Sequence, residues 1–331
     1  MSTALDTTGN EPPQSLQIDA DLPAGSPPVS APGNISVRGS VRAGVCVRAG
    51  GSMLIEGSVE GATLHAGADI TIRGTLIGAR DAHIACAGTL RARLINNADI
   101  EAEHDLWSEL EIAHSRVICG GAVRCPIGHI LGGHITANAG VSCGTLGSPG
   151  VGGAPTIVEV AIDEALRRAS AAHCPTILAN LDRITKVRTK VHPLMAHLKQ
   201  LTPQQKETAT ELLAEAAALE EATSILAARL KTQIADSLTR AARTLFVAAA
   251  IHPGTTIRFP VAQMIVEKQT KGPFRITADG KGASAKVLMV NPADRQPISP
   301  KFSLYTDGPT AELQRALVAV ETSRQPTRKA A

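Results

Sequence analysis

The sequence predicts a mainly β solenoid, a right-handed β-helix, interrupted by a long antiparallel coiled-coil hairpin. Three observations predict this fold class: a short motif that returns every 17 or 18 residues, apolar residues that alternate with polar ones inside each copy, and a later change to helical spacing. A period near 20 residues is typical of a solenoid, in which each coil stacks only on its neighbours.

The repeats occupy residues 34–160. The motif VRGSV at residues 37–41 returns as IEGSV at 55–59 and as IRGTL at 72–76. Apolar and polar residues alternate inside each copy, which is a β pattern, and no helical pattern separates the copies. Stacked coils would be about 4.8 Å apart and would place the repeated glycines above one another where each coil turns. We expect about seven such coils.

Composition sets further limits. Residues 1–33 contain six prolines among Ser, Gly and Asp, so we expect a disordered leader there. Aromatic residues make up only 2% of the chain, so aliphatic residues must fill the interior. The net charge of +3 is too small to indicate a class of binding partner. Because no secretion signal is recognisable and no apolar run reaches the roughly 18 residues of a membrane span, we expect a cytoplasmic protein with reduced cysteines and no membrane span.

Helical spacing replaces the β pattern over residues 161–246. Apolar residues recur there at intervals of four and three, in two runs separated by QLTPQQKE. This predicts two antiparallel helices of about 40 residues in a hairpin up to about 60 Å long. Thr202 and Pro203 suit the beginning of the second helix, and Pro175 should begin the long part of the first. Arg188 interrupts the apolar stripe and is a candidate interaction residue.

Strand patterns return over residues 247–290, which should complete the solenoid after the hairpin. Residues 291–331 should form a flexible tail with one short amphipathic helix at about 309–322. Leu313 and Leu317 lie on the apolar face of that helix and are further candidate interaction residues.

Two charge blocks occupy the predicted hairpin. A basic helix can bind nucleic acid, but the hairpin would fold the basic block 183–199 against the acidic block 207–221. We therefore expect ion pairs between the two helices and no nucleic-acid partner. The basic residues are Arg183, Lys186, Arg188, Lys190 and Lys199, and the acidic residues are Glu207, Glu211, Glu215, Glu220 and Glu221.

Several short segments carry a resemblance to a known family. They are DITIRGTLIGA at 69–79, LINNADIEAEHDL at 94–106, LGS at 146–148 followed by TIVEV, and IHPGTTIRF at 251–259. Together they are similar to the flagellar assembly protein A (FapA) family over about residues 34–290. The resemblance implies a non-enzymatic cytoplasmic scaffold or interaction protein linked to flagellar assembly or polar localisation, and it transfers no catalytic residue. The Pro-rich leader stands where the family usually has an N-terminal domain, and Glu159 stands where the family tends to have Gly.

Two alternatives to a scaffold are open. Apolar residues at six-residue intervals, from Ile35 to Val59, fit the rhythm of hexapeptide β-helix acyltransferases, which use a histidine as general base. The same rhythm fits the coils of bactofilin-like proteins, which polymerise end to end. The candidate general bases are His65, His83, His104, His114, His129 and His134.

A metal site is a weaker interpretation of the cysteines and histidines. Some of them would meet between stacked coils, but their spacings match no standard zinc pattern. We therefore expect no metal ligand, no cofactor and no catalytic residue. The residues considered are Cys119, Cys125, His129, His134 and Cys143.

The beginning of the solenoid is the last candidate site. If the first coil begins at Asn34, its outer N–H and C=O groups form an unpaired edge, which is a template for another chain. We expect Ile35, Val37 and Val41 on this edge to mediate self-association, and protein partners to bind this end of the solenoid or the hairpin.

Overall fold

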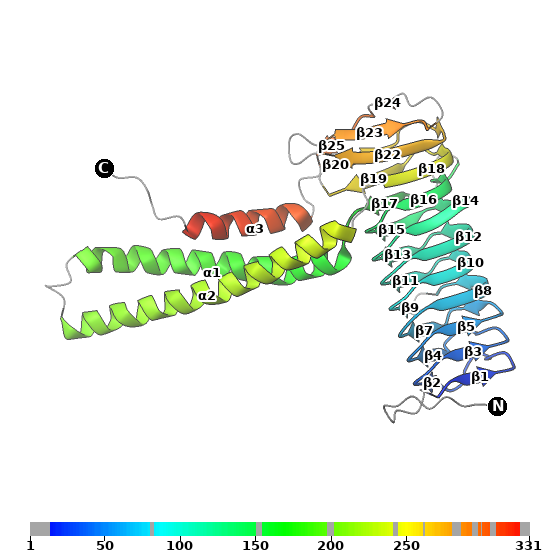
Figure 1. Cartoon of the computed structure of the whole chain (residues 1–331), viewed down its shortest axis with the longest axis horizontal. Coiled ribbons are helices and arrows are strands. Elements are labelled where there is room, and N and C mark those ends of the chain that lie inside the picture. The colour runs from blue at the N-terminus through cyan, green and yellow to red at the C-terminus, as the bar shows by residue number, and fades with distance from the viewer. Residues whose placement is uncertain are drawn as a thin grey trace, which may run out of the picture. The chain divides into compact units, whose positions relative to one another are not determined.

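The structure is a computed structural model that describes two units of the chain. The described residues are 14–79, 83–149, 154–196, 202–240, 244–260, 262–279, 286–292, 297–298, 300–304 and 309–324. One unit comprises Met1–Ile162 with Ala241–Leu304, and the other comprises Asp163–Arg240 with Tyr305–Ala331. The first unit is a β-solenoid, as predicted, and the second contains three helices (Figure 1).

Two long sheets form the solenoid, and every coil contributes to both sheets. Sheet A consists of β1 (Leu16–Ile18), β3 (Ile35–Val37), β5 (Met53–Ile55), β6 (Val59–Glu60), β8 (Ile70–Ile77), β10 (Leu90–Asn96), β12 (Leu106–Ala113), β14 (Val123–Leu131), β16 (Val141–Leu146), β18 (Thr244–Ile251), β21 (Thr270–Lys271), β22 (Phe274–Asp279), β23 (Lys286–Val290) and β24 (Pro297–Ile298). Sheet B consists of β2 (Val29–Ala31), β4 (Cys46–Ala49), β7 (Thr63–Ala66), β9 (His83–Cys86), β11 (Asp99–Ala102), β13 (Arg116–Cys119), β15 (Gly133–Ala137), β17 (Thr156–Val160), β19 (Thr255–Phe259), β20 (Ala262–Ile265) and β25 (Ser303–Leu304).

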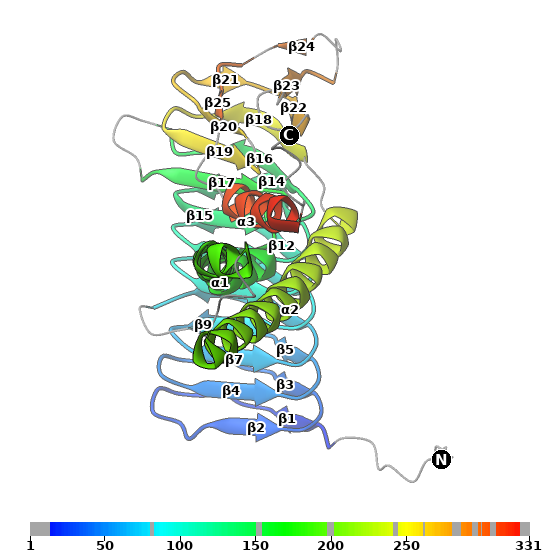
Figure 2. The same ribbon diagram turned by 90° about the vertical axis from the view of Figure 1, so that its left-hand side faces the viewer.

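The coils stack as parallel ladders in chain order, as Figures 1 and 2 show. Seven coils lie between residues 34 and 160, as predicted. The pair β1 and β2 adds one coil before them, and β18 with β19 adds one after the helical segment. Inward positions on successive rungs form aliphatic ladders. In one of them Ile35, Met53 and Ile70 are in register and at most 1% exposed.

The glycine of the repeated motif lies where sheet A bends between two faces of the coil. A Cβ atom built at Gly57 would lie 2.6 Å from the carbonyl oxygen of Gly39, and one at Gly74 would lie 2.5 Å from that of Gly57. Both approaches are shorter than any real Cβ contact, so the stacked coils leave no room for a side chain. The residue after each glycine joins the coils, because the hydroxyl of Ser40 accepts the N–H of Ser58 at 3.1 Å.

Residues 16–31, predicted to belong to a disordered leader, form the first coil instead. β1 pairs with β3, and β2 pairs with β4. Pro23, Pro27 and Pro28 lie between β1 and β2, where they interrupt no ladder, and Leu22 and Ala31 fill inward positions. The prediction is wrong for this segment because a count of prolines does not show that they fall in a turn. Residues 1–13 lie outside the described residues.

The opposite end of the solenoid is closed by antiparallel strands. β22 pairs with β18 and β20 pairs with β19, both antiparallel, and β23 lies beyond β22. β24 and β25 extend these strands from within 291–331, which also contains α3 (Pro309–Arg324). The prediction of a flexible tail is therefore wrong for β24 and β25, since two-residue strands carry no recognisable period, whereas α3 lies where a short helix was predicted at about 309–322.

The second unit contains α1 (Glu164–Ala196), α2 (Pro203–Arg240) and α3. Thr202 begins α2 as predicted: its hydroxyl accepts the Gln205 N–H at 3.3 Å, and the Gln205 side chain accepts the Thr202 N–H at 3.0 Å, which is a capping box. α1 begins eleven residues before Pro175, where Asp163 accepts the Leu166 N–H at 3.2 Å. Pro175 lies inside the helix, so its prediction as a beginning is wrong.

We expect Gly57→Ala to lower the free energy of unfolding by about 1–3 kcal/mol, because the new methyl group overpacks the contact between coils. Urea denaturation of the full chain measures the change. Thr71→Ala, on the outward side of β8, is the control and should change the free energy by less than about 0.5 kcal/mol. Equal effects of the two substitutions would contradict the close approach at the bend.

Candidate functional site

Two buried apolar clusters hold the helical unit together. The first joins α1, α2 and α3 and includes Ile177, Leu230 and Leu313, each at most 1% exposed. The second joins α1 and α2 alone among the described residues and includes Val191 and Ala216. α3 therefore packs against one part of the α1–α2 pair, and the part around Val191 has no such third helix.

The three predicted interaction residues of this unit contact helices of their own chain. Val187 takes the inward place beside Arg188, whose guanidinium lies 2.7 Å from the Glu220 carboxylate and donates to the Ser323 carbonyl at 3.3 Å. Leu313 is buried in the three-helix cluster, and Leu317 packs against it. These residues thus dock α3 onto α1 and α2, and Lys231 adds an ion pair with Glu321 at 2.7 Å.

The basic and acidic blocks meet between α1 and α2, as predicted. Arg183 pairs with Glu215, and Arg188 pairs with Glu220. These contacts join residues early in the basic block to residues late in the acidic block, and the Asn180 amide donates to the Thr223 hydroxyl at 3.1 Å. Lys186 instead pairs with Asp182 on its own helix at 2.6 Å, and Lys199 lies outside the described residues.

The predicted unpaired edge at residues 35–41 is already paired on both sides. β3 lies between β1 and β5, and Val41 forms bridges to Leu22 and Val59. Ile35, Val37 and Val41 are at most 1% exposed. The edge prediction is wrong because β1 and β2 form a coil before β3, so the outer edge within the described residues lies at Leu16–Ile18 and Val29–Ala31.

The backbone geometry of this N-terminal edge follows from the parallel pattern. The Leu16 N–H donates to Asn34 at 2.8 Å, and the Ile18 carbonyl accepts from Arg38 at 2.9 Å. Alternate residues of a parallel strand address opposite neighbours. The N–H and C=O of Gln17 therefore point away from β3, and Leu16 beside it is 37% exposed.

The candidate general bases are distributed along the solenoid. His65 and His83 are neighbours in adjacent coils, with ring centroids 6.0 Å apart, and burial, followed by the charges of Arg48 and His83, lowers the pKa of His65. His104 is exposed between β11 and β12, and His129 is exposed on β14. His114 and His134 line one shallow pocket of about 460 Å³.

A buried carboxylate joins three coils beside that pocket. Glu159, which is 1% exposed, lies on β17 with its carboxylate 3.1 Å from His134 and 3.3 Å from Arg258. The Thr136 hydroxyl donates to the same carboxylate at 3.1 Å. Thr136, Glu159 and Arg258 occupy one rung position on successive strands, so this cluster links β15, β17 and β19. In the sequence, Glu159 stands out only because the family tends to have Gly there; its partners follow from the strand register.

The cysteines behave as interior side chains. Cys125 and Cys143 are in register on β14 and β16, whereas Cys119 lies on sheet B. Burial raises the pKa of the Cys119 thiol to about 12 and that of Cys125 to about 11. Such thiols are protonated at neutral pH, which disfavours metal binding and nucleophilic attack. Within the described residues, no group of three or more His, Cys, Asp or Glu side chains could hold a metal ion.

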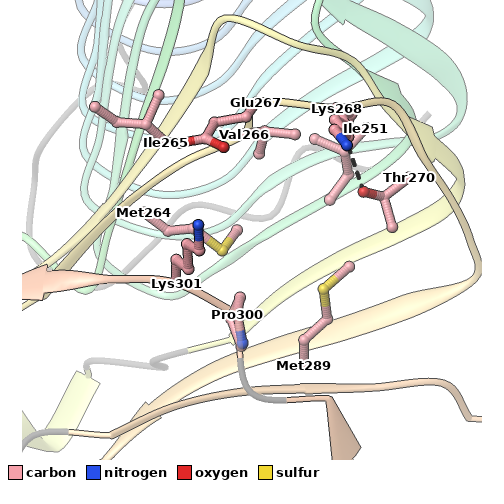
Figure 3. Close-up of a pocket in the computed structure, with 10 residues that line it drawn as sticks. All are labelled: Ile251, Met264, Ile265, Val266, Glu267, Lys268, Thr270, Met289, Pro300 and Lys301. Atoms are coloured by element: carbon pink, nitrogen blue, oxygen red, sulfur yellow. Dashed lines mark hydrogen bonds between the residues drawn. The ribbon is translucent and has the colours of Figure 1, made fainter.

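The antiparallel strands that close the solenoid contain a second pocket of about 230 Å³ (Figure 3). Ile251, Met264 and Met289 give it an apolar lining. Glu267 and Lys301 are among its polar lining residues. The largely apolar lining offers surface for an apolar group.

The family comparison agrees with the solenoid geometry. The family model of the Flagellar Assembly Protein A (FapA) beta solenoid domain matches residues 14–282. The chain belongs to the FapA family. The FapA match begins in the coil of β1 and β2, which confirms the resemblance and extends it to the first coil. No curated protein and no solved structure matches the chain.

No helix in the described part of this FapA chain is long and apolar enough to cross a membrane. Its two long helices carry many charged residues, and Arg183 and Arg188 of α1 pair with Glu215 and Glu220 of α2.

We expect the double variant Arg183→Glu/Arg188→Glu to lower the melting temperature of the full chain modestly. Exposed ion pairs contribute about 0.2–1 kcal/mol each, and salt screens them. Adding Glu215→Arg and Glu220→Arg should restore part of the loss at low salt. A melting temperature that does not change with these charges or with salt would show that the blocks act as independent solvated surfaces.

Proposed function

We propose that this FapA-family protein is a non-enzymatic cytoplasmic scaffold in flagellar assembly or polar localisation. The family match over residues 14–282 is the observation that carries the proposal. FapA is not known as an enzyme family, and the geometry around the candidate histidines fits structural roles: Glu159, for example, binds His134 and Thr136 of β15 and Arg258 of β19.

We further propose that α1 and α2 form an antiparallel coiled-coil hairpin, and that the part with the end of α1 and the beginning of α2 binds a protein partner. Two features support this assignment. Among the described residues, α3 packs its apolar face against the cluster that contains Ile177 and Leu230, and its end reaches Arg188 through Ser323, so the part of α1 and α2 beyond Arg188 has surface that α3 does not cover. The beginning of α2 exposes the carboxylates of Glu207 and Glu211, together with Leu213, which is 40% exposed. An apolar side chain among acidic ones suits a partner with a basic and apolar face.

A surface variant of the full chain tests the hairpin assignment. Glu207→Lys/Glu211→Lys/Leu213→Asp should fold with an unchanged solenoid, because all three side chains are exposed. Cells that carry this variant should have fewer flagella or misplaced ones. The variant should also fail to form the crosslink to the partner that the wild type forms. Arg38→Glu/Arg73→Glu, on the solenoid surface, is the matched control and should retain both. Normal flagella and an unchanged crosslink in the triple variant would exclude this part of the hairpin.

The solenoid also offers a way for two copies to associate. Among the described residues, no strand pairs with the outer side of β1 or β2, whereas β20 and β22 cover the parallel strands at the other end. Head-to-tail polymerisation through the edges, as in a bactofilin-like polymer, needs both ends. We propose that copies instead pair through their N-terminal edges, which gives a closed dimer with the same surface on each subunit.

Gln17→Pro/Ser30→Pro tests this pairing. These residues point away from β3 and β4, so proline removes donors of the outer edge without removing a ladder bond of the chain itself. Sedimentation should show the wild type at twice the 34.3 kDa chain mass and the variant at the chain mass. Wild type and variant at the same mass would exclude edge pairing, and a mass that grows with concentration would favour the polymer.

A further inference from the structure

The single tryptophan of the chain lies on the outside of the solenoid. Trp107 is on β12 between the inward residues Leu106 and Ser108, and it is 36% exposed. Aromatic residues make up only 2% of the sequence, and the interior ladders are aliphatic. Trp107 therefore contributes its apolar area to the surface of sheet A rather than to the core.

Two arginines on neighbouring rungs hold the indole between them. Arg91 on β10 and Arg124 on β14 are in register with Trp107. Their guanidinium carbons lie 5.9 Å and 5.2 Å from the indole centroid, within the range of cation–π attraction. Asp105 pairs with Arg124 and fixes it from the other side. The aromatic ring is thus already ordered in the free protein, which lowers the entropy lost on binding.

The same strands expose aliphatic side chains at the neighbouring bend. Leu110 is 43% exposed and Ile127 is 83% exposed. A Cβ at Gly128 would lie 2.1 Å from the Leu110 carbonyl oxygen, so the two bends are stacked closely. The buried Ser108 hydroxyl donates to the Glu111 carbonyl at 2.8 Å and holds the bend from inside. Leu110 and Ile127 therefore project from a fixed backbone.

Of the arginines beside these apolar groups, one forms an ion pair within the described part of the chain and two do not. Arg124 has the Asp105 carboxylate, whereas Arg91 and Arg93 are exposed and form no ion pair with any residue that the structure describes. Glu109 is exposed between Trp107 and Leu110. The Arg91 guanidinium beside the tryptophan, and that of Arg93 on the same strand, can therefore receive carboxylates from another molecule.

We propose that Arg91, Arg93, Trp107, Leu110, Arg124 and Ile127, the Trp107 surface, bind a short segment of a protein partner that presents an apolar side chain beside Asp or Glu. Tryptophan and arginine dominate the binding energy of protein interfaces, and aliphatic neighbours exclude water around them. Single-stranded nucleic acid fits less well, because it needs several stacking rings and the Trp107 surface presents one. This site is separate from the hairpin, and the proposal holds whether or not the hairpin binds a partner.

A peptide-display experiment on the full chain tests the proposal. Random peptides of about a dozen residues are selected on the wild type after removal of those that bind Trp107→Ala. Selected peptides are then synthesised and titrated against the wild type, with tryptophan emission as the reading, since Trp107 is the only tryptophan. A single-stranded oligothymidine of similar length is titrated in parallel. Thermal melting shows that each variant is folded.

The expected peptides combine Asp or Glu with a large apolar residue and change the emission of Trp107. Arg91→Glu/Arg93→Glu should weaken their binding about tenfold or more. Arg48→Glu, an exposed arginine on sheet B, should leave it unchanged. No enrichment of acidic peptides, or equal binding to the Arg91→Glu/Arg93→Glu variant, would overturn the proposal. Quenching by oligothymidine without peptide binding would assign the surface to nucleic acid instead.

Discussion

In-register stacking of each coil on the next is the constraint on which the rest of the structure depends. It brings backbones so close that only glycine fits at positions such as Gly57 and Gly74. It lets a side-chain oxygen of one coil accept an N–H of the next, as Asp21 does for Ser40 at 2.7 Å. It also leaves a narrow interior that aliphatic side chains fill in register, which explains a folded chain with so few aromatic residues.

Periodicity was sufficient to predict the solenoid because every coil repeats the same local requirements. The first coil and the last two strands were not predicted, because their sequences do not repeat the motif of the inner coils. In the first coil, Leu22 and Ala31 occupy inward positions as in the other coils. The prolines between β1 and β2, however, give this segment the composition of a disordered one. At the other end, β24 and β25 are two residues long, and only their antiparallel partners identify them as strands.

Some contacts of the candidate site residues could be predicted from the sequence and others could not. The charge blocks predicted the pairs Arg183–Glu215 and Arg188–Glu220, because a hairpin brings its own two halves together. The apolar face of α3 was also visible in the sequence, but not the helices that cover Leu313. An apolar stripe shows that a face will be buried; it does not identify what buries it.

The outward positions of a solenoid are best compared along the rungs rather than along the chain. Residues some 16–20 apart in sequence lie side by side, so one line of sheet A contains Thr71, Arg91, Trp107, Arg124 and Ser142 in register. Its middle three residues combine an aromatic ring with two cations, whereas its neighbours are small and polar. Coils that share one interior design can therefore differ sharply in what they present outside. In such a scaffold, the interior specifies the fold, and local departures on the outer face provide the sites for partners.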